Sequence, residues 1–276
     1  MGADRQTANA TDAGLVSGRS GAGAVVDRLP TGRRVGRGLF GIVAFVGLWW
    51  AVSFTQPPYI LPAPDAVAAA FLNELRGGTM LVALRDSMLH WIPGTIVGTL
   101  VGIGLGVAMG WSELVDDAMA PIVRLLRPVP PLALIGFAIA WFGINHTGAA
   151  FIVAVGALWI NFYATYGAVE NVSTELVDVA RSLGVQHNLK LLRSVVIPAA
   201  LPAILTGVRT GIGRCWMLVV AAEIFGVSGI GRQIIRAGDN LRVDRVIAYI
   251  LVLSIVYLIV DAAFRSVSQR VIAWQN

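Results

Sequence analysis

Charged residues are scarce in this chain. Asp, Glu, Lys and Arg make up 13% of its 276 residues, against about a quarter in soluble domains. Apolar residues make up 56%, and the mean hydropathy is +0.73. This composition excludes an ordinary soluble domain, which could not bury so much apolar surface. The net charge is +5, but the basic residues flank apolar runs, so we expect anionic lipid headgroups as their partners and no nucleic acid.

The chain also lacks the patterns on which most catalytic and metal sites are built. Its single cysteine, Cys215, allows no intrachain disulfide. There is no His-Glu-x-x-His and no Gly-x-Ser-x-Gly, and His90, His146 and His187 are far apart in sequence, so we expect them at loop or interface positions. The stretch 226–233 has the glycines of a phosphate loop without its Lys-Ser/Thr pair. We therefore expect no enzyme activity, metal or cofactor in this chain. If nucleotide powers transport, a different polypeptide must bind the ATP and Mg²⁺.

Long uncharged runs predict an all-α membrane protein with about six transmembrane helices, because about 20 apolar residues are needed to cross the ~30 Å hydrocarbon core. The predicted spans are 39–56, 91–112, two within 128–169 that are joined by a turn at 143–148, 199–222 and 246–264. Pro128, Pro130 and Pro131 crowd the start of the third span. Proline removes a helical N–H donor, so we expect this span to be short or interrupted.

Arginines and lysines in the short loops predict the orientation in the cell membrane. They gather in the first 37 residues and in the loops after the second and fourth spans. We therefore expect these segments and both termini to be cytoplasmic. Four further arginines, Arg232, Arg236, Arg242 and Arg245, follow the fifth span on the predicted outer side, and the sequence offers no physical reason for them. Residues 1–35 are predicted to be a disordered cytoplasmic tail, and 36–276 the transmembrane domain.

Glycines recur at every fourth position of the second predicted span, so that small surfaces lie along one side of a helix. These glycines are Gly94, Gly98, Gly102, Gly106 and Gly110. Such a stripe lets another helix approach closely. The sequence leaves open whether that helix belongs to this chain or to a second subunit.

A polar segment between the fourth and fifth spans carries the most specific motif. Its pattern, acidic-x-Ala-x-x-x-Gly followed by aliphatic-x-aliphatic-Pro, runs from Asp178 through Gly184 to Pro198. It resembles the EAA loop of ABC importer permeases. Matches at 60–64, 126–133, 141–144, 200–209 and 222–231 extend the resemblance, over about residues 39–274, to permeases of the nitrate, sulfonate and taurine importer family. Two details depart from that family: Asp178-Val179-Ala180 replaces Glu-Ala-Ala, and the distance from Gly184 to Pro198 is one residue longer than usual.

The resemblance implies a type I ABC importer transmembrane domain, with a permease core at about 84–266 and a cytoplasmic coupling loop at about 170–196. The implied partners are an ABC ATP-binding subunit, an extracytoplasmic substrate-binding protein, the lipid bilayer and a second copy of this chain. The residues implied to contact the ATP-binding subunit, or to shape the coupling loop, are Glu175, Leu176, Asp178, Val179, Ala180, Arg181, Leu183, Gly184 and Pro198.

Arg209 and Arg214 stand near the middle of the fifth span, where an arginine costs at least ~2.5 kcal/mol to insert, so they must face protein or water. Glu223 follows Arg209 by close to four helical turns. Our hypothesis is that Arg209, with Arg214, attracts an anionic substrate along a path that this span lines, and that Arg209→Gln abolishes uptake without disturbing assembly. The alternatives are an Arg–Glu bridge to a neighbouring helix or an interhelical contact with a backbone carbonyl.

The resemblance favours a small anion as the substrate: an aliphatic sulfonate, taurine or nitrate. A heterocyclic vitamin precursor is the alternative within the same importer class. A secondary transporter or channel for small anions would share the hydropathy pattern, but such proteins usually show internal repeats or intramembrane acidic relays, and neither is visible here.

Overall fold

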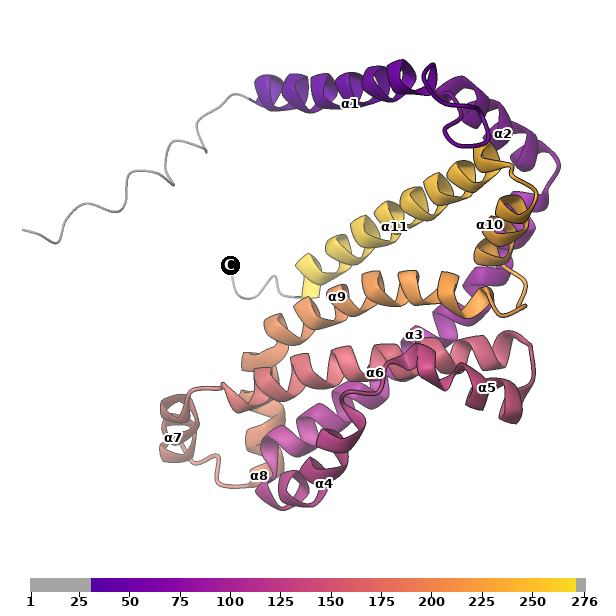
Figure 1. The fold of residues 1–276 in the computed structure, drawn as a ribbon. Coiled ribbons are helices and arrows are strands. Elements are labelled where there is room, and N and C mark those ends of the chain that lie inside the picture. Colours follow the sequence, from indigo (N-terminus) through magenta and orange to yellow (C-terminus); the bar gives the residue numbers. More distant parts are fainter. Residues whose placement is uncertain (1–30, 272–276) are drawn as a thin grey trace, which may run out of the picture. The chain divides into compact units, whose positions relative to one another are not determined.

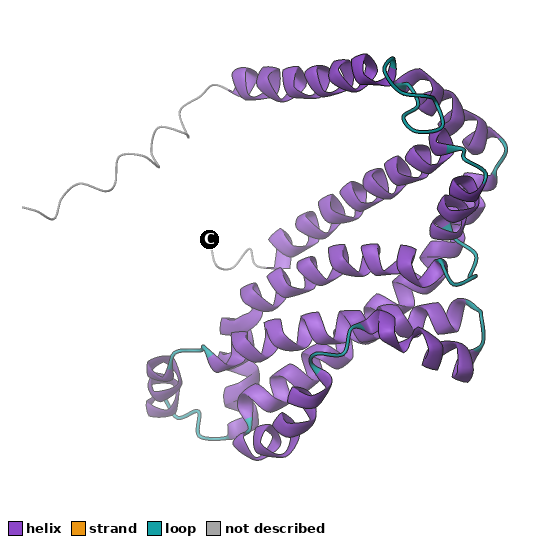
Figure 2. Ribbon diagram, in the orientation of Figure 1, coloured by secondary structure: helices purple, strands orange, loops and turns teal. Residues whose placement is uncertain are grey.

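Every regular element between residues 31 and 271, the part of the chain that the computed structural model describes, is a helix (Figures 1 and 2). In chain order the elements are α1 (Thr31–Ser53), α2 (Pro64–Arg76), α3 (Thr79–Trp111), α4 (Glu113–Leu126), the 3₁₀ turn η2 (Pro131–Leu134), α5 (Ile135–Phe142), α6 (His146–Glu170), α7 (Thr174–Ser182), α8 (Asn188–Leu191), the π-helical turn η3 (Leu192–Val196), α9 (Ile197–Glu223), α10 (Ile230–Asp239) and α11 (Val243–Val271). Most of the tail predicted over 1–35 lies outside the described residues.

Five of these helices are long and apolar enough to cross a membrane: α1, α3, α6, α9 with the turns before it, and α11. They correspond to the predicted first, second, fourth, fifth and sixth spans. α1 belongs to one compact unit (Met1–Thr55), and the helices from α2 onward form a second (Gln56–Asn276). α3 begins 12 residues before the predicted start at Trp91. The prediction began too late because the first turns of α3 contain charged residues such as Arg85 and Asp86, which interrupt the apolar run.

The third predicted span is a broken one. α5 has only 8 residues, too few to cross a bilayer by itself. α4 and the stretch η2–α5 are long and apolar enough to cross a membrane only if the two are counted as one span. The two parts are bent by 82° at the break between Leu126 and Pro131. Pro128, Pro130 and Pro131 lie at this break, where each lacks the N–H that would continue a helix. The prediction of an interrupted span is therefore confirmed, and the number of spans is five or six.

The glycine stripe of α3 lies against α6 of the same chain. A Cβ atom built on Gly94, Gly98 or Gly102 would overlap the carbonyl oxygen of Ala150, Ala154 or Leu158, respectively. Gly106 and Gly110 meet α6 in the same way one and two turns further on. Only glycine allows the two backbones to approach this closely. The stripe is thus placed within one chain, and it makes α3 and α6 a tightly packed pair.

The centre of the second unit is formed where α9 packs onto α3 and α6. Val153, Cys215 and Val219 are fully buried there. Trp91 of α3 and Trp216 of α9 meet edge to face, with ring centroids 5.2 Å apart, a geometry that aromatic pairs favour. This core holds α9 rigidly on one side and leaves its other side uncovered.

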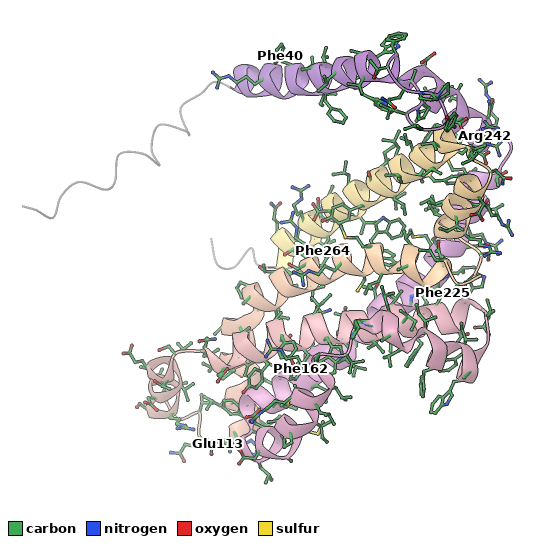
Figure 3. The ribbon with its side chains drawn as sticks, viewed as in Figure 1. Phe40, Glu113, Phe162, Phe225, Arg242 and Phe264 are labelled. Atoms are coloured by element: carbon green, nitrogen blue, oxygen red, sulfur yellow. The ribbon has the colours of Figure 1, made fainter. Side chains whose placement is uncertain are left out.

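The second unit has two distinct ends (Figures 1 and 3). α4, α7 and α8 gather at one end, near Glu113, and the turn after α9 lies at the other, near Phe225. The unexplained arginines follow that turn. Two of them are paired with carboxylates: Arg242 with Asp244 at 2.7 Å and Arg245 with Glu74 of α2 at 3.2 Å. These pairs reduce the excess of positive charge at that end.

Candidate functional site

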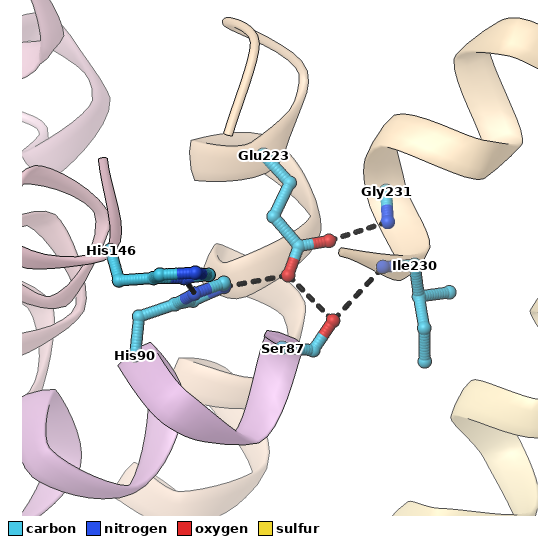
Figure 4. A network of polar contacts seen from close by, with 6 residues as sticks. All are labelled: Ser87, His90, His146, Glu223, Ile230 and Gly231. Atoms are coloured by element: carbon cyan, nitrogen blue, oxygen red, sulfur yellow. Dashed lines mark hydrogen bonds and ion pairs between the residues drawn. The ribbon is translucent and has the colours of Figure 1, made fainter. Parts of the chain in front are cut away.

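Glu223, the last residue of α9, lies in a fully buried polar network (Figure 4). Its Oε1 accepts a hydrogen bond from the Ser87 hydroxyl at 2.6 Å and lies 2.6 Å from Nε2 of His90. Its Oε2 accepts a hydrogen bond from the backbone N–H of Gly231. Ser87 in turn accepts from the N–H of Ile230 at 3.0 Å. A carboxylate needs several such partners to be buried, and here α3 and α10 supply them.

The glycines that resemble part of a phosphate loop make room for this carboxylate. A Cβ atom on Gly229 would overlap the Glu223 carboxyl group, and one on Gly231 would overlap the carbonyl oxygen of Val220. The Gly229-Ile230-Gly231 turn therefore lets α10 bring two backbone N–H groups to Glu223 and Ser87. These glycines therefore make room for a carboxylate of the protein itself, that of Glu223.

Two of the three histidines meet beside this network. Nδ1 of His90 lies 3.2 Å from Nδ1 of His146, and the two rings stack with centroids 5.5 Å apart. His146 is at a loop edge as expected, since it is the first residue of α6. The expectation was wrong for His90, which is fully buried in α3. Four helices, α3, α6, α9 and α10, are thus joined by one polar cluster, and nothing in the sequence linked its members.

Arg209 does not pair with Glu223. Its guanidinium forms two hydrogen bonds to Asp261 of α11, from Nε at 2.7 Å and from Nη2 at 3.1 Å. Arg265, one turn further along α11, also contacts Asp261 at 3.1 Å. Of the alternatives that the sequence left open, the Arg–Glu bridge to a neighbouring helix comes nearest, but the partner is the aspartate Asp261 of α11 and not a glutamate.

Arg214 forms no ion pair with any residue of the described part of the chain. It belongs to a stripe of exposed residues that recurs every three or four positions along α9: Ala203, Thr206, Thr210, Arg214 and Met217. This spacing places them on one side of the helix. An arginine and two threonines on an uncovered side of a spanning helix are poorly suited to lipid. That side of α9 is suited to an aqueous path or to a second subunit.

Two grooves lie beside the exposed stripe of α9. The α9/α11 groove has a volume of about 750 Å³, and Arg209, Arg214 and Tyr257 are among its lining residues. The α6/α9 groove has a volume of about 560 Å³, and Arg127, Tyr163 and Arg214 are among its lining residues. Thr206, Thr210 and Arg214 border both grooves. Arg127 and Tyr163 were not among the residues predicted from the sequence.

The predicted coupling segment forms a short helix at the end of the bundle. α7 exposes the apolar side chains of Leu176 (44%) and Val179 (57%), and Leu183 beside it is 80% exposed. Ala180 is buried instead. Asp178 and Arg181 form an exposed pair at 3.8 Å, which contributes little to stability. Glu175 is exposed in the first turn.

The two backbone positions singled out by the motif also have clear roles. Gly184 ends the α7 turn with φ at +92°, a conformation that side-chain-bearing residues rarely adopt. Pro198 is the second residue of α9 and follows the π-helical turn η3. A π-turn closes i→i+5 rather than i→i+4 hydrogen bonds and so takes up one more residue than an α-turn. The turn at Leu192–Val196 therefore takes up one more residue than an α-helical turn would between Gly184 and Pro198.

No group of three or more His, Cys, Asp or Glu side chains in the described residues is placed to hold a metal ion. Cys215 is fully buried in the core.

Comparisons with known proteins agree on one family. Residues 98–273 match the family described as binding-protein-dependent transport system inner membrane component. The taurine transport system permease protein of Escherichia coli strain K12 is 31% identical over 257 residues, which cover 90% of this chain and 93% of that protein. The nitrate import permease protein of Leptolyngbya laminosa is 33% identical over 59% of each chain. The inward-facing methionine ABC transporter MetNI superposes with a TM-score of 0.62 at 17% identity, over 69% of this chain and 95% of that one, which shows the fold.

Proposed function

This chain belongs to the family of binding-protein-dependent transport system inner membrane components, and from that premise we propose that it carries a small anion along the exposed side of α9 when a separate ATP-binding subunit acts on α7. It is the permease subunit of an ABC importer. The observation that carries the proposal is Arg214, which is exposed on a spanning helix and has no carboxylate partner in the described residues.

The proposed docking surface for the ATP-binding subunit consists of Leu176, Val179 and Leu183. These apolar side chains are exposed at the end of the bundle where α4 and α8 also lie. This end carries the loops whose basic residues predict a cytoplasmic location. Because exposed ion pairs such as Asp178–Arg181 contribute little, apolar contact and shape must provide most of the docking energy.

The same geometry supports a proposal for the remaining partners. An extracytoplasmic binding protein would approach the opposite end, near α10 and the turn after α9. A second copy of this chain would face the uncovered side of α9, so that two exposed stripes enclose one path. From the loop charges we further propose that both chain termini are cytoplasmic, and we propose that the partner subunit holds ATP and Mg²⁺.

Relatives that carry taurine and nitrate favour a small anion as the substrate of this chain. A strain that lacks this gene tests the proposal by growth on taurine or ethanesulfonate as sole sulfur source and on nitrate as sole nitrogen source. We expect growth on at least one of them to fail and to return with the wild-type gene. Unchanged growth on all three would contradict an anionic substrate. Uptake that continues after ATP depletion would instead favour a secondary transporter or channel.

A further inference from the structure

The α6/α9 groove has an unusual charge balance for a membrane-spanning bundle. Two guanidinium groups line it, those of Arg127 and Arg214, and no carboxylate is among its lining residues. Neither arginine forms an ion pair within the described residues. Two cations that share a low-dielectric groove repel each other unless an anion lies between them. The charge of the groove therefore favours an anion.

Tyr163 provides a second, independent indication of a ligand. Its hydroxyl is buried and has no hydrogen-bond partner, although buried polar groups are almost always paired. Its ring lies 5.1 Å from the guanidinium carbon of Arg127, a cation–π contact that holds Arg127 at the groove. The groove is thus lined by a tyrosine whose buried hydroxyl has no hydrogen-bond partner and by two arginines without ion-pair partners in the described residues.

The two threonines on α9 cannot serve as donors to such a ligand. Thr206 donates its hydroxyl to the carbonyl of Pro202 at 2.9 Å, and Thr210 donates to the carbonyl of Thr206 at 3.0 Å. The donors that remain free are the Tyr163 hydroxyl and the N–H groups of Arg127 and Arg214. Guanidinium groups match the paired oxygens of a sulfonate, carboxylate or phosphate, to which they can bind with two hydrogen bonds.

The α9/α11 groove is less suited to an anion. Its Arg209 is already bound through two hydrogen bonds to Asp261, so a substrate would have to displace an intrachain carboxylate. The sequence suggested an anion site at Arg209, in the α9/α11 groove. The α6/α9 groove is the better location for such a site, and Arg214 lines both grooves.

We propose that Arg127, Tyr163 and Arg214 form a binding site within the permease for a small organic oxyanion with a short apolar tail. The oxyanion would accept hydrogen bonds from these three side chains. The tail would lie against the apolar wall that Trp159, Ile160 and Ala203 provide on the same groove. An alkylsulfonate fits this description better than nitrate does, because nitrate leaves the apolar wall unused. The inference rests on the proposed function and specifies the chemistry of its path.

Equilibrium binding of radiolabelled ethanesulfonate to the full-length chain in nanodiscs of phosphatidylcholine tests the site. Arg127→Gln and Arg214→Gln should each weaken binding by about tenfold or more, since a hydrogen bond to a charged group contributes a free energy of that order. Tyr163→Phe should weaken binding several-fold while the protein remains at least as stable, because the lost hydroxyl has no protein partner. Arg124→Gln is the matched control. It removes an exposed arginine one turn before Arg127 that does not line the groove, and it should bind normally.

An anionic lipid headgroup offers the same chemistry as the free oxyanion, and nanodiscs that contain phosphatidylglycerol separate the two sources. Ethanesulfonate binding that is retained in both lipids supports a solute site. If the wild-type chain binds no ethanesulfonate in phosphatidylcholine and instead retains phosphatidylglycerol through Arg127 and Arg214, the groove is a lipid site and the inference is wrong. Equal binding by all variants would also overturn it.

Uptake by the complete importer distinguishes failure of this inference from failure of the proposed function. If the wild-type complex with its ATP-binding subunit drives ethanesulfonate uptake and the Arg127→Gln and Arg214→Gln complexes do so equally well, the permease function stands and the site is refuted. If the wild-type complex transports none of taurine, ethanesulfonate and nitrate, the proposed anionic substrate fails, whatever the variants do.

Discussion

His90 Nε2 lies 2.6 Å from Glu223 Oε1, and both side chains are completely buried. Their contact joins the middle of α3 to the end of α9, over 133 residues of sequence. Because Ser87 and the N–H of Gly231 also depend on Glu223, the carboxylate is the common partner of three groups on α3 and α10. It fixes the geometry of the end opposite α7.

Glu223→Ala should destabilise the protein strongly. The change leaves Ser87, His90 and the Gly231 N–H buried without their acceptor, at about 1 to 3 kcal/mol for each group. Thermal unfolding in detergent should show a Tm lower by at least roughly 6 °C, since each kcal/mol lowers the Tm of a chain of this size by about 2 to 4 °C. Asp239→Ala, which removes an exposed carboxylate from α10, is the control and should leave the Tm nearly unchanged. A Tm for Glu223→Ala within 2 °C of wild type, roughly the effect of half a kcal/mol, would show that the network contributes little.

Gly98→Ala should disrupt the α3–α6 contact. The added methyl group overlaps the Ala154 carbonyl oxygen and the Ala157 side chain, and overpacking of this kind costs about 1 to 3 kcal/mol. Gly104→Ala is a matched control on the same helix, because a Cβ there meets nothing within 4 Å. It should be neutral or slightly stabilising, since alanine favours a helix. Equal unfolding temperatures for the two variants would mean that the helices pack less closely than described.

Asp261→Asn should show whether Arg209 stabilises the packing of α11 or contacts the substrate. Loss of the carboxylate leaves Arg209 and Arg265 close together without their counter-charge, so we expect the free energy of unfolding to fall. The double variant Arg209→Gln, Asp261→Asn should recover part of this loss, as a double-mutant cycle would measure. If the double variant also recovers uptake, Arg209 positions α11. If uptake fails whenever Arg209 is absent, the original hypothesis of a direct substrate contact is supported instead.

Much of the architecture could be predicted because membrane insertion constrains local sequence strongly. The spans followed from uncharged runs, and the break at Pro128, Pro130 and Pro131 followed from their missing N–H groups. The glycine stripe of α3 predicted close packing, since its four-residue spacing is visible in the sequence alone. Each of these features depends on neighbours in the chain.

The polar contacts could not be predicted, because they depend on which helices become neighbours. Glu223 and Arg209 lie on one helix at a spacing that suggested a shared face, yet they bind His90 of α3 and Asp261 of α11. The site proposed in the α6/α9 groove needs Arg127, which lies in the predicted loop after the second span and carried no signal of a ligand in the sequence. The π-helical turn before Pro198 had a visible signal in the extra residue after Gly184, but its position in the chain required the structure.

Photo-crosslinking from Val179 in intact cells is the most direct test of the central claim. That claim is that a separate ATP-binding subunit binds α7 inside the cell. A photoreactive residue at Val179, which is 57% exposed on α7, should form an adduct with a nucleotide-binding protein. The same residue at Leu241, which is 66% exposed after α10, should not. An adduct with an ATP-binding subunit from Val179 alone is the predicted result. The account would be contradicted by no such adduct from Val179, or by one that forms only from Leu241.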